Sequence, residues 1–151
     1  MYCWYENKDA GIFFDVLPSV SMRYCIPSMS KDEKKSIELY PFICKKELKV
    51  ILRDYKKKNF YEFKIPKGYC FDGATIPRFF WRIIGPSTDN KFLVSALIHD
   101  VLCEHHEYVN YDKSFSTNVF NTLLEGSGVN RFKRFCMKNT VAFYQTLFCK
   151  W

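Results

Sequence analysis

Two short stretches of the chain carry residue types that could do chemistry. The first, residues 71–77, reads Phe-Asp-Gly-Ala-Thr-Ile-Pro and predicts a tight polar turn, because Gly73 lets the backbone bend sharply. The second, residues 95–100, places His99 and Asp100 side by side in a segment that is otherwise apolar and has the spacing of a helix. The function should depend on how these two stretches meet.

The imidazole of His99 is predicted to face the interior or a cleft. Phe92, Ala96 and Cys103 share its helical face by their spacing of three and four residues. Asp112 lies on the apolar stripe of the next helix, where a carboxylate is unusual because burying an unpaired charge is costly. If the two helices pack antiparallel, Asp112 would hold one nitrogen of His99 and leave the other as a general base. A purely structural hydrogen bond is the alternative.

Asp72 and Asp100 form a second candidate pair, in this case for a metal. Two carboxylates and the backbone carbonyls around Gly73 are the oxygen ligands that calcium or another divalent cation prefers. Two alternatives stay open: Asp72 caps the following helix or closes an Asx turn, and His99 is a ligand for a transition metal. No organic cofactor is expected. A His-Asp phosphohydrolase is disfavoured, because that class needs a further histidine upstream and all three histidines lie at or after position 99.

A dense aromatic cluster follows the polar turn. Pro77 suits the first position of a short helix, and Phe79, Phe80 and Trp81 come directly after it. Such a cluster is typical of a core. The other interpretation is an apolar lip over a binding site, in which Thr75 and Trp81 would contact the substrate.

The elements that must position these residues predict an α+β fold. Alternating apolar residues over 47–55 and 60–65, joined by a polar turn, predict a β-hairpin, and shorter strands are expected over 12–17 and 22–26. Helical periodicity is expected to continue to the end of the chain. We therefore expect an N-terminal hairpin or small antiparallel sheet packed on a C-terminal bundle of three to four helices. The last helix should span about 130–148. Its predicted inward residues are Phe132, Phe135, Cys136, Phe143 and Leu147.

The bulk composition fits one globular domain without a membrane span. The chain has 151 residues, 19% aromatic residues and a formal net charge of +7. A generic lysine-rich surface is the favoured interpretation of that charge, and nucleic-acid binding is disfavoured because no recognisable module supports it. None of the seven cysteines forms a Cys-x-x-Cys pair, so we expect reduced thiols and no structural zinc. Neither a signal peptide nor a transmembrane segment is expected.

The ordered motifs resemble a phage-associated family of unknown function, DUF1353. The resemblance is carried by the runs 71–81 and 96–102 and then by Asp112 and Phe115, which match that family's Asp-Gly-Ala-Ser/Thr-x-Pro, His-Asp and Ala-Asp-x-x-Phe motifs. It covers roughly residues 48–147. It implies a phage or prophage context and supplies no activity.

Two departures from the family pattern concern the lining of the site. Cys103 stands where an aromatic residue is usual, and Tyr111 stands where a small residue is usual. We expect residues 1–151 to form a single domain, and the extent of the resemblance divides it into two parts. Residues 1–46 would be an irregular or β N-terminal extension, and residues 47–148 would be the family core.

A more distant similarity concerns the site alone. Calcium-dependent phospholipase A2 enzymes, especially bacterial ones, order an Asp-Gly-Cys-Ser motif, then His-Asp in a helix, then Asp in an antiparallel helix. By this similarity Asp72, Gly73 and Asp100 would hold calcium, His99 would activate water and Asp112 would orient His99. The disulfides usual in those enzymes have no counterpart here.

Two classes of function follow as expectations. The first is a metal-assisted hydrolase of an ester or amide in lipid or cell-envelope material. The second is a non-enzymatic tail- or capsid-associated component of the virion, whose partners would be other phage structural proteins. In both cases we expect synthesis in the host cytoplasm, and in the second also incorporation into the particle.

Overall fold

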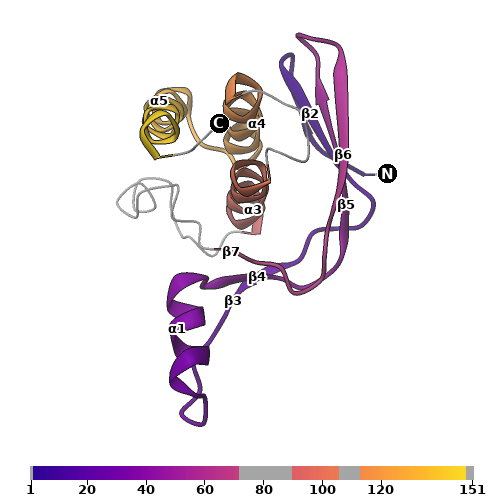
Figure 1. Ribbon diagram of the computed structural model, residues 1–151. Helices are drawn as coiled ribbons and strands as arrows, with labels where there is room; N and C mark the ends of the chain where they lie inside the picture. Colours follow the sequence, from indigo (N-terminus) through magenta and orange to yellow (C-terminus); the bar gives the residue numbers. More distant parts are fainter. Residues whose placement is uncertain (1, 72–89, 106–112, 149–151) are drawn as a thin grey trace.

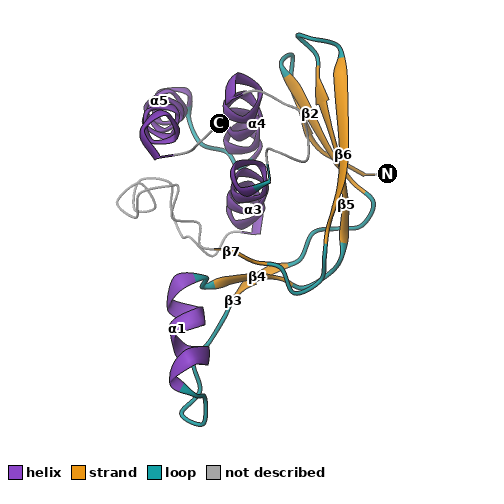
Figure 2. Cartoon of the chain, in the orientation of Figure 1, coloured by secondary structure: helices purple, strands orange, loops and turns teal. Residues whose placement is uncertain are grey.

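The computed structural model describes residues 2–71, 90–105 and 113–148, and the fold is α+β as the sequence predicts (Figures 1 and 2). Two antiparallel sheets come from the N-terminal half of the chain, and helices from the C-terminal half pack on them. None of the helices in this described part combines the length and the apolar character that a membrane crossing requires.

The larger sheet has four strands in the order β1-β2-β5-β6, all antiparallel to their neighbours. Its strands are β1 (Tyr2–Glu6), β2 (Ala10–Phe14), β5 (Leu48–Asp54) and β6 (Asn59–Ile65). The predicted hairpin is confirmed as β5 and β6, paired from Leu48 opposite Ile65 to Asp54 opposite Asn59. Alternate side chains of β5 are buried, so one face of this sheet covers the core and the other faces solvent.

A smaller three-stranded sheet, in the order β3-β4-β7, joins the larger sheet to the helices. It contains β3 (Val20–Met22), β4 (Phe42–Cys44) and β7 (Cys70–Phe71), and α1 (Lys31–Leu39) connects β3 to β4. Ser30 and Glu33 form a capping box at the start of helix α1.

The two early strands are shorter than expected and start nearer the N-terminus. The strand expected over 12–17 is β2, and the one expected over 22–26 is β3. Strand β2 ends at Phe14, where the carboxylate of Asp15 takes the place of its carbonyl and accepts the backbone N–H of Lys49 at 2.8 Å.

Three C-terminal helices are described: α3 (Asn90–Glu104), α4 (Lys113–Gly126) and α5 (Arg131–Phe148). Helices α3 and α4 run antiparallel, because Ser95 near the start of α3 meets Ser127 just beyond α4, whereas His99 meets Phe120. In Figure 1 these two helices lie against the larger sheet, and α5 forms the outer layer.

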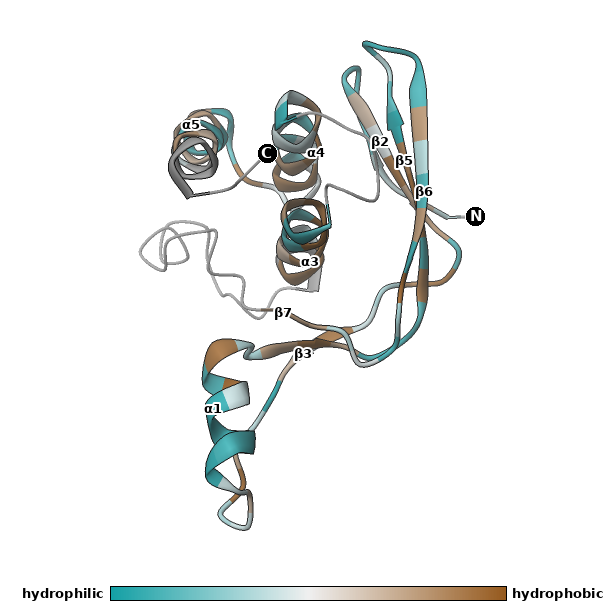
Figure 3. Cartoon of the chain, in the orientation of Figure 1, coloured by the Kyte–Doolittle hydropathy of each residue, from teal (hydrophilic) through white to brown (hydrophobic). Residues whose placement is uncertain are grey.

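Helix α3 is buried on every side, which differs from the single inward face that the spacing predicts. All residues from Leu93 to Leu102 are buried. The larger sheet and α4 cover it, and β3 packs against it as well (Figure 3). A helix with apolar residues all round is stable only when it is enclosed in this way.

The orientation predicted for the last helix is wrong. The helix itself is confirmed as α5, but Phe132, Phe135 and Phe143 are 76%, 66% and 66% exposed. Cys136 is half-buried, and the side chain of Leu147 lies outside the described residues. The buried residue among the described side chains of α5 is instead Met137, which is 1% exposed.

Candidate functional site

His99 lies in the middle of α3, enclosed by apolar neighbours. Its side chain is fully buried, and its ring centroid is 4.7 Å from that of Phe120 on α4. The thiol of Cys103, one turn along α3, is 3.8 Å from Nε2 and 4.0 Å from Nδ1. Burial lowers the pKa of His99 to about 4, so the imidazole is neutral at pH 7.

Asp100 is the second buried ionisable residue of α3. Its Oδ1 lies 4.0 Å from Nδ1 of His99, and its side chain is 3% exposed. Because the imidazole is neutral at pH 7, the two groups do not form an ion pair there. The pair can nevertheless stabilise a positive charge that develops on the ring, since the carboxylate is close and the surroundings are dry.

Sequence reasoning missed the hydroxyl groups between α3 and α4. Ser95 is fully buried, and the Oγ atoms of Ser95 and Ser127 are 3.3 Å apart. Ser127 also donates to the carbonyl of Leu123 at 2.9 Å. Serines inside otherwise apolar helical runs were the available signal, because a buried hydroxyl needs a hydrogen-bond partner.

The strand that leads into the first motif ends close to α3. Tyr69, just before β7, donates from its hydroxyl to Glu104 at 2.5 Å, and its ring is 6.1 Å from that of His105. Phe71, the last residue of β7, is fully buried in the same core cluster as the apolar residues of α3. Tyr69, two residues before the end of β7, therefore lies beside the C-terminal end of α3, about one turn beyond Asp100.

Helix α4 begins one residue after Asp112. Lys113 and Phe120 are seven residues apart, which is about 10 Å along a helix. The described residue that faces His99 from α4 is thus Phe120, and the first turn of α4 lies about two turns away from it.

Of the seven candidate site residues, the described part of the chain contains His99 and Asp100, and it brings them together. The others lie outside the described residues: Asp72, Gly73, Thr75, Trp81 and Asp112. Within the described part, no three His, Cys, Asp or Glu side chains come together as a possible metal site.

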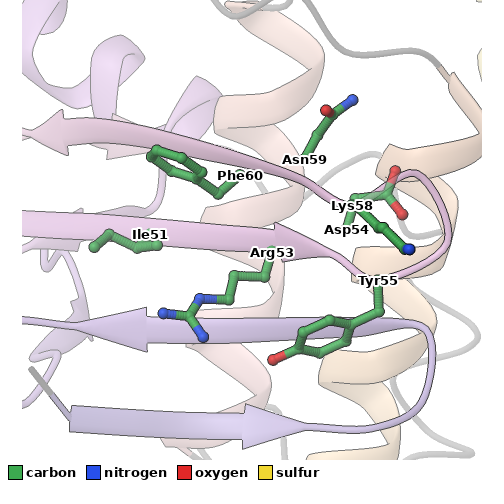
Figure 4. Close-up of a pocket in the computed structure, with 7 residues that line it drawn as sticks. All are labelled: Ile51, Arg53, Asp54, Tyr55, Lys58, Asn59 and Phe60. Carbon is green, nitrogen blue, oxygen red and sulfur yellow. The ribbon is translucent and has the colours of Figure 1, made fainter.

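A pocket of about 380 Å³ lies at the turn of the β5–β6 hairpin, on the solvent face of the larger sheet (Figure 4). Its lining includes Arg53, Tyr55, Lys58 and Phe60. Helices α3 and α4 lie behind the sheet in this view, so the pocket is separate from His99.

The comparison with protein families matches residues 49–141 to DUF1353, described as a protein of unknown function. The match covers more than half of the chain and includes the whole of α3 and α4. The chain belongs to this family. The resemblance seen in the motifs is therefore confirmed at the level of the DUF1353 family, which carries no assigned activity.

One curated relative extends this result. The DUF1353 chain is 33% identical over 86 residues to the uncharacterized protein y4jT of Sinorhizobium fredii (strain NBRC 101917 / NGR234). The aligned part is 57% of this chain and 25% of y4jT, so the chain spans about a quarter of the relative's length. No solved structure matches this chain.

Proposed function

We propose that this DUF1353 protein is a phage or prophage hydrolase that cleaves an ester or amide in lipid or cell-envelope material. The observation that supports the proposal is the buried His99–Asp100 pair in α3, with 4.0 Å between Nδ1 and Oδ1. Two ionisable side chains enclosed in an apolar core are costly to fold, and such groups cluster at functional sites.

In the proposed reaction, His99 accepts a proton from the attacking water. Its pKa of about 4 leaves it neutral and ready to accept, but also makes it a weak base. The carboxylate of Asp100, with its Oδ1 4.0 Å from Nδ1, lies beside the ring that would take the proton. The proton then passes to the leaving alcohol or amine, and the carbonyl carbon keeps the oxygen of water, which gives the acid product.

The proposed reaction also uses a bound divalent cation, and calcium is the cation we propose. Asp100 fits it in chemistry, since a buried carboxylate is a hard oxygen ligand, and Asp72 with the carbonyl of Gly73 would supply further oxygens. When bound, the cation would polarise the substrate carbonyl. Thr75 and Trp81 would contact the substrate.

Hydrolysis by the purified chain tests the proposal. A panel of phospholipid, ester and amide substrates is assayed with calcium and with a chelator. His99→Ala is compared with His105→Ala, a matched variant at a histidine that is 43% exposed. Calcium-dependent turnover that is lost only in His99→Ala, with both variants folded by circular dichroism, supports the proposal. No turnover on the whole panel, or turnover that survives in His99→Ala, overturns it.

A second candidate function, a structural component of the virion, is favoured by a different observation. Residues 23–40, which we call the α1 arm, project away from the body of the protein (Figure 1). Tyr24, Ile26 and Leu39 on this arm are 75%, 53% and 55% exposed. Exposed apolar side chains of this size are typical of a surface that meets a partner protein.

Particles of the phage or prophage distinguish the two functions. If the protein is structural, it is present in purified particles, Tyr24→Ser with Leu39→Ser blocks assembly, and His99→Ala assembles normally. Absence of the protein from purified particles excludes this second candidate.

A further inference from the structure

Helix α5 turns three of its phenylalanine side chains toward solvent. Phe132, Phe135 and Phe143 are 76%, 66% and 66% exposed. Their positions along the helix place them on one side of it, with exposed Asn139 between them. We call these three residues the phenylalanine stripe. Scattered exposed apolar residues need no explanation, but three large rings on one face of one helix do.

The stripe faces solvent because other residues of α5 hold the helix to α4. Met137 is 1% exposed, and α5 packs against α4. Nη1 of Arg134 lies 3.0 Å from Oε2 of Glu125, and the Arg134 side chain is 16% exposed. Met137 and Arg134 are three residues apart and lie on the side of α5 opposite to the stripe. Turning the stripe inward would break both contacts.

Basic residues flank the stripe on both sides. Arg131 and Lys138 are seven residues apart and share one side of the helix, while Lys133 lies beyond the other edge of the stripe. Arg131 is exposed, and the two lysines are half-exposed. Among all 18 residues of α5 there is no Asp or Glu.

These charges do not serve the helix itself. Arg131, Lys133 and Arg134 stand in its first turn, where the helix dipole disfavours positive charge. Asn130 caps that turn by accepting the backbone N–H of Lys133 at 2.8 Å, so the capping needs none of the cations. Arg134 lies beside Glu125, and Arg131 and Lys133 are the cations of this first turn that border the stripe.

We infer that α5 is an interfacial anchor, which docks the protein on an anionic lipid surface. An amphipathic helix with aromatic rings on one face, cations beside them and no acidic residues has the pattern that lies in the plane of a membrane interface. The rings enter the boundary of headgroups and acyl chains, and Arg131, Lys133 and Lys138 meet lipid phosphates. Among the described elements α5 forms the outer layer of the fold (Figure 1), and the three rings of the stripe are exposed.

This inference deepens the proposed function and rests on it for the identity of the substrate. A hydrolase of lipid or envelope material gains from being held at the surface where its substrate lies. Docking itself needs neither His99 nor hydrolysis, so the two ideas can fail separately.

Co-sedimentation with lipid vesicles tests the anchor. The full chain is mixed with vesicles of phosphatidylcholine alone or of phosphatidylcholine with phosphatidylglycerol. The variant Phe132→Ser/Phe135→Ser/Phe143→Ser removes the stripe. Its matched control replaces three aromatic residues of similar exposure elsewhere, Tyr2, Tyr24 and Phe60, which are 66%, 75% and 70% exposed.

We expect the unchanged chain, the matched control and His99→Ala to bind the anionic vesicles, and binding to neutral vesicles to be much weaker. Removal of the stripe should weaken binding by about 100-fold, because each inserted ring adds buried apolar area. Equal binding by the stripe variant and its control overturns the inference. So does a dimer in analytical ultracentrifugation that disappears in the stripe variant, since the stripe is then an interface between two copies.

The charges are tested in the same assay. Arg131→Gln/Lys133→Gln/Lys138→Gln is compared with Lys45→Gln/Lys46→Gln/Lys67→Gln, which lowers the net charge equally at exposed positions outside α5. Binding should fall at least about tenfold in the first variant only, because each cation near an anionic surface adds attraction. An equal fall in both variants contradicts a local role for α5.

Discussion

The ring of His99 packs against the ring of Phe120, with 4.7 Å between the two centroids and 52° between the ring planes. This contact joins α3 to α4 in the middle of both helices. The ring of Phe120 occupies space beside His99 that water would fill around an exposed histidine. The imidazole therefore stays neutral at pH values where a free histidine side chain is already half protonated.

The first prediction concerns stability against pH. The pKa of His99 is about 4 in the folded protein and 6.5 in the unfolded chain. Between these values the unfolded chain binds the proton more readily, so the free energy of unfolding falls as the pH drops from about 6.5 to 4. Above pH 6.5 the neutral His99 costs no free energy of unfolding. Near pH 4 the free energy of unfolding is lower by at most about 3 kcal/mol. Urea unfolding followed by tryptophan fluorescence at several pH values measures this slope.

The control for this prediction is a histidine whose side chain reaches water. His99→Gln should remove most of the pH dependence in this window, whatever it does to stability at pH 7. His105→Gln should leave it in place, because the His105 side chain is 43% exposed. A slope that is unchanged in His99→Gln would show that other groups cause the acid sensitivity.

The fold was largely accessible from the sequence because its elements carry strong local signals. The alternation from Leu48 to Ile65 predicted the central hairpin, and the apolar period from Phe115 to Leu124 predicted the buried side of α4. Both patterns are dense enough that a shift of one residue would expose several apolar side chains. Short strands such as β3 carry no such signal, and their bounds were missed.

The rotation of α5 was not accessible for a physical reason. Apolar periodicity identifies the apolar face of a helix. It does not determine which side of the helix packs against the rest of the protein. In α5 the inward side chains are Met137 and Arg134, whose partners on α4 are set by the tertiary structure. The His99–Asp100 pair was predicted because two ionisable residues in an apolar helix stand out, whereas Phe120 as the neighbour of His99 depends on the register of two helices.

The second prediction concerns thiol reactivity. Cys44 is fully buried, and burial raises the pKa of its thiol, whereas Cys3 and Cys25 are exposed. N-ethylmaleimide should modify Cys3 and Cys25 in the native protein, while Cys44 reacts only after unfolding. Mass spectrometry of tryptic peptides after labelling with and without urea measures each site. Rapid labelling of Cys44 in the native protein would contradict the placement of β4 in the core.

The third prediction concerns Gly126, the last residue of α4. A Cβ atom at this position would lie 2.7 Å from Cγ of Tyr5 on β1, which is too close for two carbon atoms. Gly126→Ala should therefore destabilise the protein by about 1–3 kcal/mol, although alanine is the better helix former. Thermal unfolding measures the change.

A second substitution identifies the cause. In a Tyr5→Ala background the close contact is gone, so Gly126→Ala should become neutral or slightly stabilising through its helix propensity. If the cost is the same in both backgrounds, the close approach of β1 to α4 is not its source.

The fourth prediction concerns Glu125, which joins three parts of the fold through one carboxylate oxygen. Its Oε2 accepts from Nδ2 of Asn7, in the β1–β2 turn, at 3.0 Å and lies 3.0 Å from Nη1 of Arg134 on α5. A double-mutant cycle with Glu125→Gln and Arg134→Gln should give a coupling of about 1 kcal/mol, because Arg134 is mostly buried. The pair Lys49–Glu62, with side chains 38% and 44% exposed, serves as the control and should give a smaller coupling, because solvent screens exposed charges. Equal coupling in the two pairs would mean that burial of Arg134 does not strengthen its contact, and α5 would then depend on Met137 alone for its orientation.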